Sequence, residues 1–127
     1  MTDQEIFNIV ALHLFKQQAG SFDEDREHCL YRNNDGLKCA IGILIPDDKY
    51  DSKMEGNLSE NKFPISVEKL LKFDFMEPYK DSRKLLIDLQ LAHDASTMRH
   101  DNFWQDCKIR LINIAEKFNL IVPSEIF

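Results

Sequence analysis

Cys39 and His93 are the side chains whose types could together carry out covalent chemistry. Cys39 follows Lys38 and precedes a predicted short helix; a nearby cation and a helix N-terminus both lower a thiol pKa and favour the nucleophilic thiolate. His93 could serve as its base. Asp94, adjacent on a helix and about 100° away around its axis, is expected not to hold the His93 ring. A cysteine-dependent hydrolase or transferase is thus one alternative, against the ordinary role of a free cysteine as a small buried hydrophobe.

A metal site could be assembled from His28, Cys29, Cys39 and His93, because zinc prefers sulfur and imidazole ligands. The chain contains no C-x-x-C or H-x-x-x-H pair, however, and structural zinc sites normally contain such local pairs. The carboxylates clustered between positions 47 and 55 lack the spacing of an EF-hand loop. We therefore predict no metal site and no cofactor.

A polar ligand site is the main hypothesis. Gln90 precedes His93 and Asp94 by about one helical turn, so all three can line one edge of a helix. If the polar residues around the preceding turn meet this edge, cationic, aromatic and amide groups come together, which suits a polar or anionic small ligand, including a nucleotide-derived one. The predicted ligand-binding residues are Tyr31, Arg32, Lys38, Glu55, Gln90, His93 and Asp94.

A β-hairpin is expected to position the first of these residues. The turn Asn33–Gly36 lies between the short runs Cys29–Arg32 and Leu37–Ala40, and Asp-Gly tolerates the positive φ that hairpin turns require. The apolar run Ala40–Ile45 is predicted to form a short helix that ends before Pro46.

Helices account for most of the remaining chain, which predicts an α+β fold that is mainly α: a compact bundle of about four to five helices with one small β-hairpin. Thr2 and Glu5 form a capping-box pattern, and apolar residues recur at helical spacing up to Gly20, the predicted stop. Later helix signals are Ser66 to Leu71, a start at Asp81 or Ser82, a start at Asp101, and a C-cap at Asn119.

Size and charge limit the function classes. With 127 residues the chain is predicted to form a single globular domain, 1–127. A net charge of −6 and a pI near 5.1 argue against duplex nucleic acid as a partner. No apolar run approaches the roughly 20 residues of a membrane span, and the N-terminus is acidic, so we expect a cytoplasmic protein without membrane contact. The sequence leaves a homo-oligomer open.

The block from Cys29 to Gly56 resembles the hallmark block of an uncharacterised family of small phage and bacterial proteins. It shares C-L-Y-R, D-G-L-K-C-A, a Gly, L-I-P-D, a Tyr and M-E-G, followed by an L-Q-x-x-H-D element at Leu89–Asp94 and a helix opened by Trp104. Ile43 departs from the family form, which often has a cysteine there. The resemblance covers nearly the whole chain and implies a phage setting in the host cytoplasm, but it carries no catalytic assignment.

Three functions are therefore expected in order of preference. The first is a non-enzymatic, phage-type accessory module that sequesters a small polar or nucleotide-derived ligand, in an anti-defence role. The second is the cysteine-dependent enzyme using Cys39 and His93. The third is an acidic inhibitor of a host protein, acting through the carboxylates at 23–25 and at Asp47 and Asp48.

Overall fold

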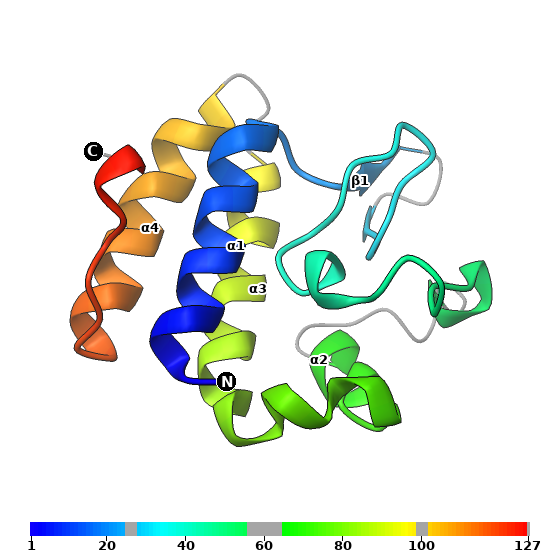
Figure 1. Ribbon diagram of the computed structural model, residues 1–127. Helices are drawn as coiled ribbons and strands as arrows, with labels where there is room; N and C mark the ends of the chain where they lie inside the picture. Colours follow the sequence, from blue (N-terminus) through cyan, green and yellow to red (C-terminus); the bar gives the residue numbers. More distant parts are fainter. Residues whose placement is uncertain (25–27, 56–64, 99–101, 127) are drawn as a thin grey trace.

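Three long helices lie side by side and form the main body of the protein (Figure 1). The computed structural model describes residues 1–24, 28–55, 65–98 and 102–126. The helices are α1 (Asp3–Gln17), α3 (Arg83–Thr97) and α4 (Phe103–Lys117), and α3 packs most extensively against α4. The predicted fold class is confirmed: the protein is mainly helical with one small antiparallel hairpin.

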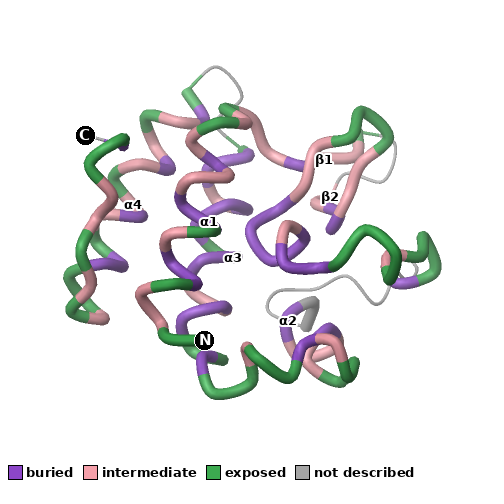
Figure 2. Tube along the Cα trace, viewed as in Figure 1, coloured by how far each residue is buried: buried purple, intermediate pink, exposed green. Residues whose placement is uncertain are grey.

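Helix α1 begins as predicted and ends earlier than predicted. Thr2 accepts the N–H of Glu5, whose carboxylate in turn accepts the N–H of Thr2, completing the capping box. The apolar side chains of the helix face the interior, where Figure 2 shows buried segments of all three long helices turned toward one another. Gln18, not Gly20, closes the helix, because its φ of 62° reverses the chain while its N–H still bonds to Leu14 O.

The other helices also follow the apolar pattern, with small shifts at their ends. Helix α2 spans Ile65–Leu70, and α3 starts directly after Ser82, whose hydroxyl donates to Asp3 on α1 rather than capping its own helix. Asn119 has the positive φ, 57°, expected of a helix-ending residue. The predicted start at Asp101 lies outside the described residues.

The hairpin forms, but from other strands than predicted. Strand β1 (Phe22–Asp23) pairs antiparallel with β2 (His28–Cys29), whereas the predicted strands around the Asn33–Gly36 turn share a single bridge, Arg32 to Lys38. Other groups take the backbone atoms that a longer ladder would need. Glu55 accepts the N–H of Tyr31, and the Cys39 carbonyl that would otherwise accept it bonds to the N–H of Ile43.

Short 3-10 helices complete the fold; η1 (Gly42–Leu44) and η2 (Ser52–Glu55) lie on the side of α1 away from α4, whereas η5 (Ser124–Ile126) lies on the α4 side (Figure 1). The segment η1 confirms the predicted short helix, and Ile45 is extended, at φ −78° and ψ 121°, as a residue before proline should be. A further turn is η3 (Asp74–Ser82). Among the described helices, none has the length and apolar character needed to cross a bilayer.

Candidate functional site

Gln90, His93 and Asp94 lie on a buried edge of α3, where hydrogen bonds link them. Gln90 Nε2 donates to Asp94 Oδ1 over 2.8 Å, and Gln90 Oε1 accepts the backbone N–H of Ile41 at 3.1 Å. None of the three residues is more than 5% exposed. This edge therefore holds the chain before η1 against α3. The side-chain nitrogen and oxygen of Gln90 both already have hydrogen-bond partners inside the protein.

His93 is fixed by both of its ring nitrogens. Its Nε2 accepts the backbone N–H of Ser21 at 2.9 Å, which places the ring proton on Nδ1, where it is donated to Asp94 Oδ1 at 2.8 Å. The expectation that Asp94 would not hold this ring is wrong. The 100° between neighbours separates their Cα–Cβ bonds, whereas the imidazole extends sideways far enough to meet a short carboxylate.

Cys39 is buried close to both Asp94 on α3 and Glu55 in η2. It is 1% exposed, its Sγ accepts the N–H of Gly42 at 3.3 Å, and burial raises its thiol pKa, with the charges of Asp94 and Glu55 adding to the effect. A neutral, covered thiol is a poor nucleophile. His93 has no free ring nitrogen to offer as a base, so this geometry gives the enzyme hypothesis no support.

Cys29, His93 and Asp94 place ligand atoms within 4.8 Å of one another, close enough to surround a metal ion. The lone pair of His93 Nε2 is already used by Ser21, and its Nδ1 proton faces Asp94. Burial, together with the charge of Asp94, also raises the pKa of the Cys29 thiol. These three residues fit a protonated hydrogen-bond network better than a set of metal ligands.

Glu55 organises the second cluster from a position that is 5% exposed. Its two oxygens accept the N–H of Tyr31 at 2.9 Å, the N–H of Arg32 at 3.1 Å and the hydroxyl of Tyr50 at 2.6 Å. Three donors compensate the desolvation of this buried carboxylate. The predicted ligand residue Glu55 thus binds the backbone at Tyr31 and Arg32 and the hydroxyl of Tyr50.

Arg32 and Lys38 are the two predicted ligand residues that reach the surface. Their side chains, 16% and 27% exposed, both contact Asp47 Oδ1, at 2.8 Å and 3.4 Å. The Arg32 guanidinium also lies 4.7 Å from the centre of the Tyr50 ring. The seven predicted residues therefore form two clusters, one around Glu55 and the Arg32–Lys38 bridge and one on α3, and Cys39 lies near both Glu55 and Asp94.

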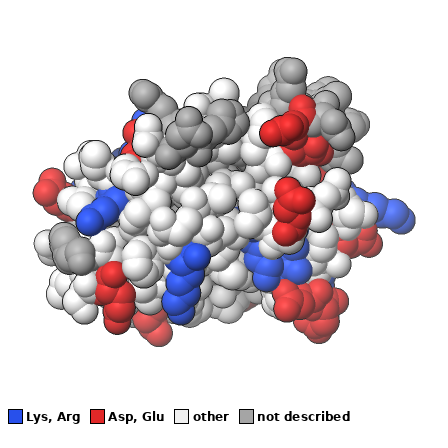
Figure 3. Space-filling model, turned by 90° about the horizontal axis from the view of Figure 1, so that it is seen from above, with Lys and Arg blue, Asp and Glu red and all other residues white. Residues whose placement is uncertain are grey.

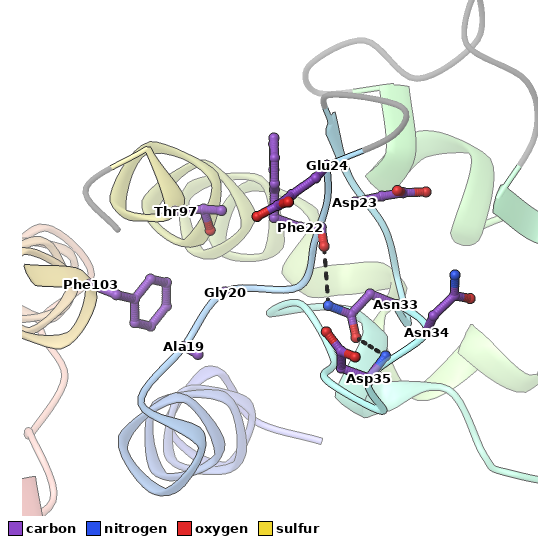
Figure 4. A pocket seen from close by; sticks show the side chains of 10 residues that line it. All are labelled: Ala19, Gly20, Phe22, Asp23, Glu24, Asn33, Asn34, Asp35, Thr97 and Phe103. Atoms are coloured by element: carbon purple, nitrogen blue, oxygen red, sulfur yellow. Dashed lines mark hydrogen bonds between the residues drawn. The ribbon is translucent and has the colours of Figure 1, made fainter. Parts of the chain in front are cut away.

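A pocket of about 470 Å³ lies beside these clusters (Figure 4). It is bounded by the chain from α1 to β1, the turn after Arg32, and the facing ends of α3 and α4. Gly20 is essential to its shape, because a Cβ there would lie 2.0 Å from Thr97 Oγ1. The lining residues are Ala19, Gly20, Phe22, Asp23, Glu24, Asn33, Asn34, Asp35, Thr97 and Phe103.

The pocket is acidic and partly aromatic. Its described lining includes three carboxylates, two side-chain amides and two phenylalanines, and none of these described lining residues is a lysine or an arginine. Figure 4 shows Glu24 pointing back toward Thr97, while Asp23 extends to the opposite side. Asn33 is immobilised, since its Nδ2 donates to Phe22 O at 3.1 Å and its Oδ1 accepts the N–H of Asp35 at 3.0 Å. The turn that carries Asp35 is thereby tied to β1.

Sequence reasoning did not predict this pocket. The pattern Asn33-Asn34-Asp35-Gly36 identified a turn, and the carboxylates at 23–25 were considered only as an acidic surface for a host protein. The two meet because Asn33 bonds across to β1, a contact between residues eleven positions apart that periodicity does not encode. Comparison of the chain with protein-family models, with curated proteins and with solved structures finds no match.

Proposed function

We propose that the protein is a non-enzymatic binding module whose acidic pocket accepts a small polar ligand carrying a positive charge, such as an amine or a guanidinium group. The observation that carries this proposal is the lining of the pocket, which combines Glu24, Asp23 and Asp35 with two phenylalanines and, among the residues that the structure describes, includes no cationic side chain. A volume of about 470 Å³ falls within the range of small-molecule sites.

The chemistry of the lining favours an organic cation over an anion. Carboxylates pair with ammonium or guanidinium groups through charge-assisted hydrogen bonds, and Phe22 and Phe103 offer ring surface to the same ligand. A nucleotide phosphate would meet like charge instead. The ligand proposed here is therefore a small polar molecule as in the first hypothesis, but it is cationic rather than anionic or nucleotide-derived.

The absence of an assembled catalytic set among the described residues supports binding rather than catalysis. His93 uses both ring nitrogens, Cys39 is covered, and Glu55 accepts three hydrogen bonds. A phage-encoded module that sequesters a small molecule in the host cytoplasm needs a pocket of this kind and no reactive group.

The third hypothesis, a broad acidic surface for a host protein, receives less support. In the view of Figure 3, acidic and basic side chains alternate around an uncharged middle, so this face presents no continuous acidic area. Local ion pairs also reduce the charge available to a partner: Asp88 is bound by Lys117 and Asp106 by Arg110.

Titration of isotope-labelled protein with argininamide and with spermidine tests the proposal. We expect shifts of the backbone amides at 22–24 and 33–35, and binding that weakens between about 0.05 M and 0.5 M salt because screening acts on exposed charges. The double variant Glu24→Gln, Asp35→Asn should bind about tenfold more weakly, because removing each exposed charge lowers the affinity by roughly fivefold or less.

The matched control is Asp48→Asn, which removes an equal charge from an exposed position outside the pocket lining. It should leave the affinity within about twofold. If neither cation shifts the pocket amides, or if the control weakens binding as much as the pocket variant, the proposal is wrong. Tighter binding of ADP than of argininamide at these residues would also contradict it.

A further inference from the structure

Arg32 reaches the protein surface with its guanidinium only partly hydrogen-bonded. One of its nitrogens, Nη2, donates both to Ile45 O and to Asp47 Oδ1, each at 2.8 Å. Among the described residues, its Nε is buried and has no hydrogen-bond partner. A guanidinium normally offers a fork of donors to both oxygens of an anion, and here Asp47 engages only one nitrogen through one oxygen.

Tyr50 and Glu55 hold the Arg32 guanidinium in place from the protein interior. Tyr50 lies under it at 4.7 Å, the Tyr50 hydroxyl is bound by Glu55 Oε2 at 2.6 Å, and the same oxygen accepts the N–H of Arg32. Glu55 is buried and uses both oxygens for these bonds and for Tyr31, so its carboxylate orients the arginine without covering its outer side. Such support fixes a cation before any ligand arrives.

Lys38 adds a second cation to the same place. The Arg32–Lys38 bridge sets the two residues opposite each other on paired segments, and directly opposed side chains point to the same face. Both reach one oxygen of Asp47. The Arg32 hydrogen bond and the Lys38 charge hold the pKa of Asp47 below its usual range.

We propose that Arg32 and Lys38 form a binding site for an oxyanion, either a phosphate or a carboxylate group, and that Asp47 occupies it as a displaceable internal counter-ion. The Asp47 side chain is 83% exposed, and exposed ion pairs are weak. An external oxyanion can take the Arg32 Nη2 and Lys38 Nζ donors that Asp47 now engages. This site is separate from the acidic pocket and does not depend on it.

The test is a titration of labelled protein with inorganic phosphate and with acetate at constant ionic strength, observed at the Arg32 Nε–H and Lys38 signals. We expect phosphate to shift both signals. Asp47→Asn removes the competing carboxylate and should tighten phosphate binding about fivefold. Arg32→Lys keeps the charge but loses the fork, and should weaken binding about tenfold.

Asp48→Asn is the matched control, since Asp48 neighbours Asp47 and is also exposed, and it should change phosphate affinity by less than about twofold. If Arg32→Lys lowers the melting temperature, Lys38→Met replaces it, with loss of affinity expected. Stronger binding of phosphate assigns the ligand as a phosphate group, and stronger binding of acetate assigns it as a carboxylate. Unshifted Arg32 and Lys38 signals, or equal affinity in Asp47→Asn and the parent protein, would overturn the proposal.

Discussion

Gly42 shows how closely η1 packs against the backbone of Tyr31. A Cβ at this position would lie 2.2 Å from the carbonyl oxygen of Tyr31 and 3.2 Å from Cys39 Sγ. The carbonyl belongs to the backbone and accepts the N–H of Cys39, so it cannot move without loss of that bond. The absent side chain is therefore a condition for bringing Tyr31 and Arg32 into position.

Gly42→Ala should destabilise the protein by about 3 kcal/mol, because the added methyl group forces the backbone apart. Gly36→Ala is the comparison, since Gly36 has a φ of 81° but open space around its missing Cβ. There the cost is only that of a left-handed alanine, about 1 kcal/mol. Urea unfolding of both variants measures the difference; equal losses would show that crowding at Gly42 is not important.

Gln90 is a buried polar residue that stabilises the protein through its hydrogen bonds to Ile41 and Asp94. Gln90→Met keeps the volume but leaves the Ile41 N–H without an acceptor inside the protein. We expect a loss of about 2 kcal/mol in the free energy of unfolding, the cost of an unpaired buried donor. The exposed Gln105→Met should change stability by less than about 0.5 kcal/mol. Hydrogen exchange should show faster opening at Ile41 in Gln90→Met alone.

At the level of secondary structure, the helix ends that are marked by capping residues or proline could be predicted. The Thr2 and Glu5 capping box and the extended residue before Pro46 involve only neighbours within a few positions, and both appear as expected. The strands were less predictable. Glu55, distant in sequence, takes the Tyr31 N–H on which a longer ladder around the Asn33–Gly36 turn would depend.

The capping box makes a direct test of how helix α1 is stabilised. Thr2→Ala removes the acceptor for the Glu5 N–H, so the free energy of unfolding should fall by about 1 kcal/mol. Thr2→Ser keeps the hydroxyl and should restore most of that loss. Thermal melts followed by circular dichroism measure both variants. If Ser and Ala destabilise equally, the cap contributes through packing rather than through its hydrogen bond.

For the molecule as a whole, burial of weakly acidic groups predicts sensitivity to alkali. Burial raises the pKa of Cys29 and Cys39, raises that of Cys107 to about 12, and raises that of Tyr31. A pKa that is higher in the folded state favours folding while the group is protonated. That contribution is complete below the unfolded thiol pKa of 9.0 and is lost as pH rises toward the folded value.

Urea unfolding at a series of pH values above 7 should therefore show stability falling beyond about pH 9. Cys107→Ala should reduce the steepness of this fall, whatever its effect at neutral pH. In parallel, Ellman's reagent should react slowly with the native thiols and quickly after denaturation. A Cys39 that reacts like a free thiol in the native protein would contradict its burial and revive the enzyme hypothesis.

The sequence alone determined the helical character of the chain, the position of its first cap, and the turn at Asn33–Gly36, because each depends on residues close together along the chain. It also identified the polar residues worth locating. The tertiary structure decided what those residues do: Glu55 and His93 turn inward to satisfy buried backbone groups, while Asn33 ties a turn to β1 and creates an acidic pocket. Such long-range hydrogen bonds depend on how the elements pack, which local pattern does not encode.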